Sequence, residues 1–152
     1  MKFRKAVRTD VPVILDMIVN DPLGKTREDV RDPLPEKYYR AFDIIHASDF
    51  QELMVVEDDA GQIIATFQLT FLQYLTYQGG LRAQVEAVRV HESQRGKGVG
   101  EAVFQWMIQR CRERGAHLLQ LTTDKKRPDA LRFYEKLGFK ASHEGMKLNL
   151  TP

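Results

Sequence analysis

Apolar residues in the first third of the chain recur at the spacing of amphipathic helices. Between positions 11 and 18 they lie three or four residues apart, directly after Thr9 and Asp10, either of which can cap a helix. A second series between 38 and 46 has the same spacing. The polar segment 25–35 between these helices contains two prolines and is predicted to be a loop.

The rest of the chain alternates between strand and helix patterns. β-forming residues dominate its middle, and helical spacing returns at 99–111 and 128–137. The predicted strands are 2–7, 53–57, 62–75, 81–90, 117–123, 139–142 and 145–150. This order predicts one domain over residues 1–152 with an α/β (α+β) fold, in which helices flank a mixed and mostly antiparallel central sheet.

Composition narrows the class of protein. Of the 152 residues, 43% are hydrophobic and 29% are charged, as in soluble globular proteins. No apolar run is long enough to span a membrane, and the N-terminus lacks the apolar core of a signal peptide. The single cysteine, Cys111, excludes an internal disulfide and favours a cytoplasmic location. The four histidines show no ligand spacing, so no metal site is expected.

Charge is distributed unevenly along the chain. The net charge of +2 argues against a dedicated nucleic-acid-binding protein. Residues 1–60 contain nine basic and thirteen acidic residues, whereas residues 61–152 contain fourteen and eight. An acidic first part and a basic second part would suit a cationic substrate and an anionic cofactor; the alternative is ordinary surface scatter.

The most specific local signal is a glycine-rich loop between the strand at 81–90 and the helix at 99–111. Its residues are Arg95, Gly96, Lys97, Gly98, Val99 and Gly100. Glycines allow the backbone to approach an anion closely, and the first N–H groups of a helix have no partner within that helix. A pyrophosphate therefore fits this loop; the alternative is a glycine-rich turn without a ligand.

Three common phosphate-binding motifs do not match this loop. A Walker A motif requires Gly where His91 stands and Ser or Thr where Gly98 stands. A dinucleotide-binding fingerprint requires Gly where Glu101 stands. A kinase glycine loop would be accompanied by an Asp-Phe-Gly motif, which the chain lacks.

Two sequence motifs, which occur here in the same order as in one known protein family, indicate a resemblance to that family. The loop from Arg95 to Gly100 resembles the acetyl-CoA signature of the GNAT N-acetyltransferase superfamily, and Ala130–Phe139 resembles the family's closing helix. Phe3–Asp10 and Val85–Val90 resemble its opening strand with helix cap and its fourth strand, so the resemblance covers nearly the whole chain. The resemblance implies transfer of an acetyl group from acetyl-CoA to a primary amine, directly within a ternary complex.

That reaction needs a base for the amine proton, an N–H donor for the thioester oxygen and an acid for the thiolate. Glu86 is the candidate base, acting through a water molecule. It is predicted to share a strand face with Val88 and Val90, whose apolar side chains would make it a stronger base. The alternative is a structural or substrate-binding carboxylate. The resemblance implies that the backbone of Val88, Arg89 and Val90 holds the pantetheine arm and polarises the thioester carbonyl.

The remaining candidates also have structural alternatives. The resemblance makes Tyr134 the candidate acid, although it lies on the apolar stripe of its helix, where a core tyrosine is the alternative. Family members often carry Asn where this chain has Arg127, which either contacts the cofactor or belongs to a solvated charge run. Cys111 lies beside Met107 on an apolar stripe and is expected to be partly buried and inert. Four aromatic residues are candidates for the acceptor pocket or for the core: Tyr38, Phe42, Phe71 and Tyr74.

Together these features predict a cytoplasmic N-acetyltransferase that acts on a small cationic amine. The alternatives are a protein or peptide N-acetyltransferase and a non-catalytic CoA-binding sensor. Neither nucleic acid nor membrane is an expected partner. Homodimers are common in the family that the chain resembles, although no interface can be identified from the sequence.

Overall fold

The computed structural model describes residues 1–152, which divide into two compact units, Met1–Gln120 and Leu121–Pro152. The helices and strands of the first unit are β1 (Lys2–Lys5), α1 (Val11–Val19), α2 (Glu36–Ala47), β2 (Gln51–Glu57), β3 (Ile63–Gln73), α3 (Thr76–Gly79), β4 (Leu81–Val90), α4 (Val99–Glu113) and β5 (Ala116–Gln120). The second unit contains α5 (Pro128–Lys136). Glu86 and the glycine loop belong to the first unit, and Arg127 and Tyr134 belong to the second.

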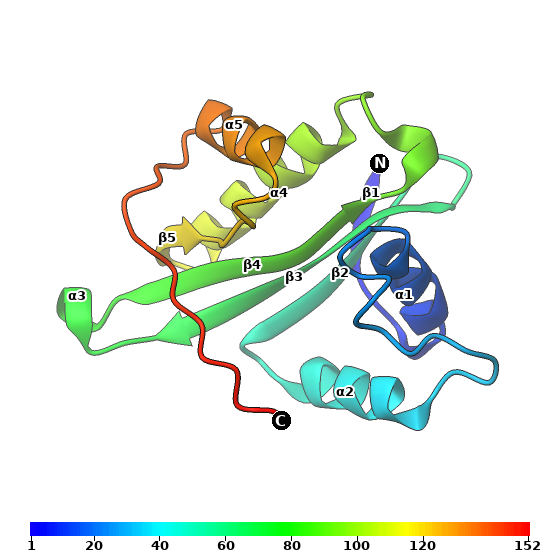
Figure 1. The fold of residues 1–152 in the computed structure, drawn as a ribbon. Helices are drawn as coiled ribbons and strands as arrows, with labels where there is room; N and C mark the ends of the chain where they lie inside the picture. The colour runs from blue at the N-terminus through cyan, green and yellow to red at the C-terminus, as the bar shows by residue number, and fades with distance from the viewer. The chain divides into compact units, whose positions relative to one another are not determined.

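The first unit is built around one five-stranded sheet with the strand order β1-β2-β3-β4-β5 (Figure 1). Neighbouring strands from β1 to β4 are antiparallel, and β5 is parallel to β4. The prediction of a mixed and mostly antiparallel sheet flanked by helices is therefore confirmed.

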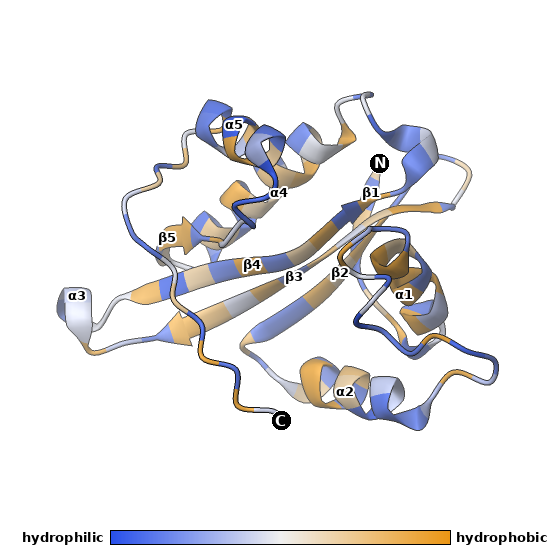
Figure 2. Cartoon of the chain, viewed as in Figure 1, coloured by the Kyte–Doolittle hydropathy of each residue, from blue (hydrophilic) through white to orange (hydrophobic).

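The two faces of this sheet are covered by different helices. Alternate strand residues point to opposite faces, and hydrophobic and hydrophilic segments accordingly alternate along β4 (Figure 2). On one face, α1 and α2 pack over β2 in a core formed by Ala6, Val11, Ile14, Leu15, Phe42 and Val55. On the other face, Trp106 of α4 stacks on Phe3 with ring centroids 4.8 Å apart and lies against the fully buried Phe67. We call these the α1/α2 face and the α4 face.

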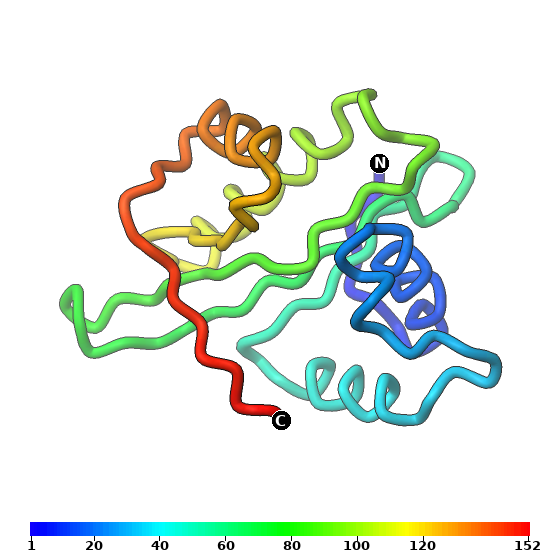
Figure 3. The backbone as a smooth tube through the Cα atoms, in the orientation of Figure 1, coloured from blue at the N-terminus to red at the C-terminus, as the bar shows by residue number.

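The hairpin of β3 and β4 extends beyond the end of β2, as the tube in Figure 3 shows. α3 closes it with a single turn in which Tyr77 and Gln78 have positive φ angles of 53° and 59°. The hairpin end of the sheet therefore lies far along β4 from α1.

The largest error of the sequence prediction concerns the end of the chain, because residues 139–142 and 145–150 form no strand. Met146, Leu148 and Leu150 alternate as strand residues do, but their side chains are 93%, 84% and 88% exposed. Alternation makes a strand only where a neighbouring strand satisfies its backbone groups, and this segment pairs with none. The expectation of one domain over 1–152 stays a prediction.

Candidate active site

A β-bulge interrupts β4 in the middle of the predicted site. Glu86 lies opposite Gln68 and Arg89 lies opposite Thr66, so Ala87 and Val88 together oppose a single residue of β3. Ala87 has a φ of 54°, in the left-handed region. β5 pairs with β4 only as far as Gln84. The second half of β4 therefore has no strand on its β5 side, where its backbone groups can bind an extended ligand.

Because of the bulge, the neighbours that were predicted for Glu86 are wrong. Because it shifts the alternation of side chains, Glu86 shares its face with Gln84 and Arg89 rather than with Val88 and Val90. Glu86 is exposed, and Gln84 Nε2 donates a 2.6 Å hydrogen bond to its Oε1. Gln120 Nε2 in turn donates to Gln84 Oε1 at 3.0 Å, which fixes the orientation of the Gln84 amide. The carboxylate is therefore held through one oxygen, and its other oxygen can accept a proton.

Arg89 links β4 to the segment that follows α1. Its Nη2 lies 3.3 Å from Asp21 Oδ2, its Nη1 donates to the carbonyl of Val88 at 2.8 Å, and both charged side chains are mostly buried. The side chain of Arg89 is thus engaged with the protein. Its contribution to a cofactor site would come from its backbone, as the family resemblance implies for Val88–Val90.

The glycine loop leads directly from β4 into α4. Gly96 and Gly98 have φ angles of 73° and 80°, and Gly98 immediately precedes the helix. A Cβ at Gly98 would meet nothing within 4 Å, so the backbone conformation, and not the available space, favours glycine there. Arg95 and Lys97 are exposed and form no ion pair. The loop and the first N–H groups of α4 therefore present positive charge to an anion.

The second compact unit carries Tyr134 and Arg127. Tyr134 is half-buried in α5, and its ring meets those of Phe133 and Phe139 edge-on with centroids 5.5 Å and 6.0 Å apart. Arg127 is half-buried immediately before α5, and its backbone N–H donates to the carbonyl of Asp124 at 2.9 Å. Lys125 is exposed and pairs with Glu144 at 3.7 Å.

The four candidate acceptor-binding aromatics do not converge on one pocket. Phe42 is 5% exposed in the core of the α1/α2 face, whereas Phe71 is 2% exposed and lies on the α4 face. The hydroxyl of Tyr38 donates to Glu28 and accepts from the N–H of Asp29. Tyr74 is 38% exposed at the hairpin end of the sheet.

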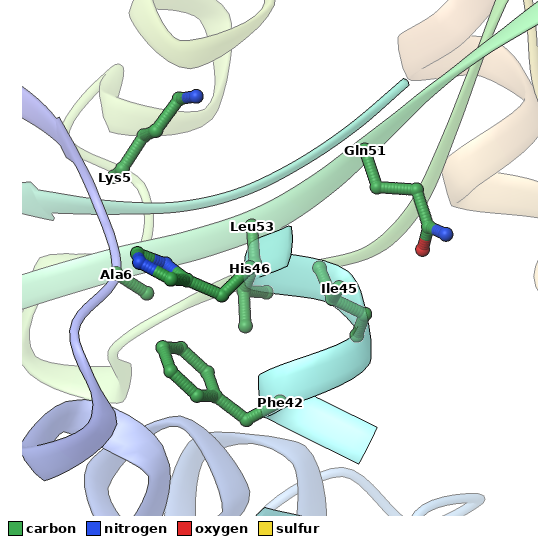
Figure 4. Close-up of a pocket in the computed structure, with 7 residues that line it drawn as sticks. All are labelled: Lys5, Ala6, Phe42, Ile45, His46, Gln51 and Leu53. Carbon is green, nitrogen blue, oxygen red and sulfur yellow. The ribbon is translucent and has the colours of Figure 1, made fainter. Parts of the chain in front are cut away.

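A small cavity between α2 and β2 does not supply an acceptor pocket either. Figure 4 shows Phe42, His46 and Leu53 grouped at this cavity, with Lys5 and Gln51 pointing away. Its volume is about 10 Å³, close to the minimum that one water molecule needs. An amine substrate cannot enter it.

Sequence reasoning missed a buried ionic cluster on the α4 face. Glu52, 2% exposed, accepts hydrogen bonds from Arg110 at 2.6 Å and 3.1 Å and from Arg114 at 2.9 Å. Burial by itself would raise the pKa of Glu52, but the hydrogen bonds and charges of Arg110 and Arg114 outweigh it and lower the pKa. The available signals were an arginine on the apolar stripe of α4 and a glutamate in an apolar strand.

Cys111, which was expected to be partly buried, is almost fully buried, with 4% of its surface exposed. Burial, with the nearby charge of Glu52, raises the pKa of its thiol to about 11. The thiol is thus protonated near neutral pH and is a poor nucleophile. Nowhere does the structure group three side chains able to ligate a metal. None of its helices combines the length and the apolar character needed to cross a membrane.

Comparison with known proteins identifies the family. The sequence profile of the Acetyltransferase (GNAT) family matches residues 17–139, and the chain therefore belongs to this family of acetyltransferases. The match includes β4, the glycine loop and α5.

Individual relatives share the fold or part of the sequence. A crystal structure described as a transcriptional regulator from Bacillus halodurans C-125 is 49% identical, with a TM-score of 0.93 over 98% of this chain and 99% of that one. The aminoalkylphosphonate N-acetyltransferase of Salmonella typhimurium is 30% identical over 55% of this chain and 53% of its own length. The glucosamine 6-phosphate N-acetyltransferase of Trypanosoma brucei brucei is 33% identical over 59% of each. The chain thus spans little more than half the length of these two enzymes.

Proposed function

We propose that this chain transfers the acetyl group of acetyl-CoA to a small primary amine, in one step within a ternary complex. The junction of β4 and α4 carries this proposal: an unpaired strand edge at Val88–Val90 leads into a loop with two positive-φ glycines and the exposed cations Arg95 and Lys97. The GNAT family uses acetyl-CoA. The pantetheine arm of acetyl-CoA carries amides that can hydrogen-bond to the unpaired strand edge. The pyrophosphate of acetyl-CoA can bind to the N–H groups of the loop.

In this proposal Glu86 accepts, through a water molecule, the proton that the amine must lose before it attacks. The amine nitrogen then bonds to the thioester carbon, the carbon–sulfur bond breaks, and Tyr134 donates a proton to the departing thiolate. The surplus proton on the new amide nitrogen passes to the tyrosinate oxygen, which leaves a neutral amide and restores Tyr134. A backbone N–H of Val88–Val90 stabilises the charge on the thioester oxygen. Arg127 adds positive charge for the cofactor phosphates. Cys111 takes no part, so no acetyl-enzyme forms.

The acceptor class is supported by the relatives. Both N-acetyltransferases are named for small amines, an aminoalkylphosphonate and an aminosugar phosphate. We therefore propose a small-molecule acceptor rather than a protein N-terminus or lysine. The acidic first 60 residues predict a cationic acceptor, but this prediction rests on overall charge alone, and the unpaired Arg82 favours an acceptor that also carries an anion. Because the family match spans both compact units, we also propose that residues 1–152 act as one domain. The cytoplasm, a reducing compartment, suits a chain with one cysteine.

A second candidate is a CoA-binding sensor without turnover. The description of the 49% identical Bacillus protein as a transcriptional regulator favours this reading. The two functions differ in one observable: a sensor would bind acetyl-CoA but release no thiol with any amine.

Binding of the cofactor is tested by thermal unfolding with acetyl-CoA, with CoA and ATP as comparisons. A ligand at about 100 times its dissociation constant stabilises a protein by about 2.7 kcal/mol, which raises the midpoint by several degrees. We expect a saturable rise with acetyl-CoA and CoA but not with ATP. Gly98→Asp should abolish the rise by repelling the pyrophosphate, whereas Gly98→Asn, equal in size and also tolerant of positive φ, should retain part of it. Equal responses of both variants would contradict the assignment of the loop.

The role of Tyr134 is tested separately. Tyr134→Phe keeps the ring that packs against Phe133 and Phe139 but removes the proton donor. We expect kcat to fall about tenfold or more, with the Kd of acetyl-CoA unchanged. Unchanged turnover would make Tyr134 a packing residue.

A further inference from the structure

We propose that the acceptor carries an anionic oxoacid group in addition to its amine, and that Arg82, which lies beside the rings of Tyr74 and Tyr77, binds this group. This inference rests on the proposed function, because it names the substrate class of the same site. It also assigns a role to Tyr74, one of the aromatic residues singled out from the sequence.

Arg82 is a half-buried cation without a counter-charge. Its guanidinium carbon lies 4.9 Å from the ring centroid of Tyr74 and 5.1 Å from that of Tyr77. The side chain of Arg82 forms no ion pair and no hydrogen bond within the protein, and its Nε is buried without a partner. A guanidinium has five N–H donors, and its rigid planar fork matches the oxygens of carboxylate and phosphate groups. Both rings lie within about 5 Å of the guanidinium, and its Nη groups, which no acidic side chain uses, are the donors to which an oxoanion can bind.

Arg82 and Glu86 lie on one row of the sheet. Arg82 pairs with Leu72, Gln84 with Thr70 and Glu86 with Gln68, so all three residues of β4 point to the α1/α2 face. Four residues of strand separate the α-carbons of Arg82 and Glu86 by about 13 Å. The amide of Gln84 lies between them and is already turned toward Glu86. A ligand along this row meets a cation at one end and a carboxylate at the other.

The turn that holds Arg82 is strained. Tyr77 and Gln78 are consecutive non-glycine residues with positive φ, a conformation that bulky side chains rarely adopt. The Tyr77 ring lies near Arg82 and also contacts His117. The ring of His117 is 5.0 Å away, and its Nδ1 hydrogen-bonds the carbonyl of Leu81. Strain of this kind concentrates at ligand sites. Here it fixes one wall around a cation that the protein itself does not neutralise.

The positions of Arg82 and Glu86 on this row determine the length and the charges of an acceptor that can bind. The amine reacts near Glu86, so the anionic group must be separated from it by several bonds to reach Arg82. An α-amino acid is too short, and a diamine would bring a second cation toward Arg82 and be repelled. The fitting class is an amine with a distant phosphate, phosphonate or carboxylate.

The test measures binding calorimetrically, so that it does not depend on turnover. Aminopropylphosphonate, γ-aminobutyrate and propylamine share the same three-carbon chain and differ in the anion. We expect the protein to bind at least one of the two anionic amines ten times or more tightly than propylamine, and the stronger of the two identifies the oxoacid. Arg82→Met should remove this preference, and Arg82→Lys should retain part of it. The matched control is Arg112→Met, because Arg112 is an exposed arginine of α4 that forms no ion pair.

Each outcome separates this inference from the proposed function. Equal binding of all three amines, or a preference that survives in Arg82→Met, overturns the role of Arg82 even if amines are acetylated. A preference lost in Arg82→Met but kept in Arg112→Met supports it even if no acetylation occurs, in which case the proposed catalysis fails alone. Thermal unfolding of each variant verifies that the fold is retained, and Leu72→Glu, which neutralises Arg82 without removing it, provides a second way to abolish the preference.

Discussion

Two arginines stack on aromatic rings at the hairpin end of the sheet, one on each face, and only one of them is neutralised. On the α4 face, Arg114 lies 4.2 Å over the ring of Phe71 and donates to Glu52 at 2.9 Å. On the α1/α2 face, Arg82 lies beside the rings of Tyr74 and Tyr77 and has no acidic partner. Both arginines interact with aromatic rings, but only Arg114 also forms an ion pair with a carboxylate. The unpaired guanidinium of Arg82 is therefore the one that can bind an anionic ligand.

The two glutamates on these faces differ in the same way. Glu52 is 2% exposed, and two arginines use its oxygens. Glu86 is exposed, and a neutral amide uses only one of its oxygens. A carboxylate with both oxygens occupied by cations stabilises the fold and cannot easily accept a proton. Burial and counter-charge therefore separate structural from reactive groups more clearly than residue type does.

The largest effect is expected from removing the neutralising acid of the α4 face. Glu52→Ala leaves Arg110 and Arg114 without their carboxylate and should lower the free energy of unfolding by about 3 kcal/mol. Urea unfolding measures the difference. Glu86→Gln serves as the matched control and should change stability by less than about 0.5 kcal/mol. A loss of similar size in both variants would show that the two glutamates do not differ as described.

Catalytic activity, unlike stability, should depend on Glu86 more than on Glu52. Glu86→Gln removes the proposed base but keeps the size of the side chain, and kcat should fall about 100-fold, or about 2.7 kcal/mol in the activation barrier. Steady-state release of CoA thiol measures this change. Glu113→Gln, at an exposed glutamate of α4, is the control and should leave kcat unchanged. Wild-type turnover in Glu86→Gln would return Glu86 to a non-catalytic role.

The pH dependence of stability should report Glu52. Its pKa is lowered in the folded protein from an ordinary value of 4.5, so its contribution is present above that pH and is lost as the pH falls through the folded-state pKa. The free energy of unfolding should therefore decrease below about pH 4.5, and Glu52→Gln should reduce this decrease. An unchanged pH dependence in the variant would mean that other carboxylates carry the effect.

Only a small effect on stability is expected from placing an acidic residue beside Arg82 on the α1/α2 face. Leu72 is the direct cross-strand neighbour of Arg82, so Leu72→Glu brings a carboxylate to the unpaired guanidinium. Stability should change by no more than about 1 kcal/mol, since a cross-strand ion pair offsets part of the lost apolar contact. Urea unfolding verifies this range. The preference for anionic amines should disappear, and its persistence would show that Arg82 is not the group that binds them.

Most of the fold followed from local patterns. Helical spacing located α1, α2, α4 and α5, β-forming runs located the five strands, and alternating glycines located the loop before α4. These signals are carried by residues that are close together in the chain. They also suffice for the family resemblance, which the match to residues 17–139 confirms.

The details of the site depended on contacts that no local pattern encodes. The bulge lies at an alanine, Ala87, where neither glycine nor proline marks an irregularity, so the neighbours predicted for Glu86 were wrong. Glu52 and Arg110 are 58 residues apart, and nothing in either segment specifies the other. Residues 145–150 show the opposite case, because a clear alternation without a partner strand formed no strand.

The most direct test of the central claim is the reaction itself. Purified protein is incubated with acetyl-CoA and an equimolar mixture of primary amines with and without a distant anion, and the N-acetylated products are identified by mass spectrometry. We predict release of CoA matched by acetylation of at least one anionic amine, with both strongly reduced in Glu86→Gln. Saturable binding of acetyl-CoA with no acetylated product from any amine would contradict the account and leave a CoA-binding sensor in its place.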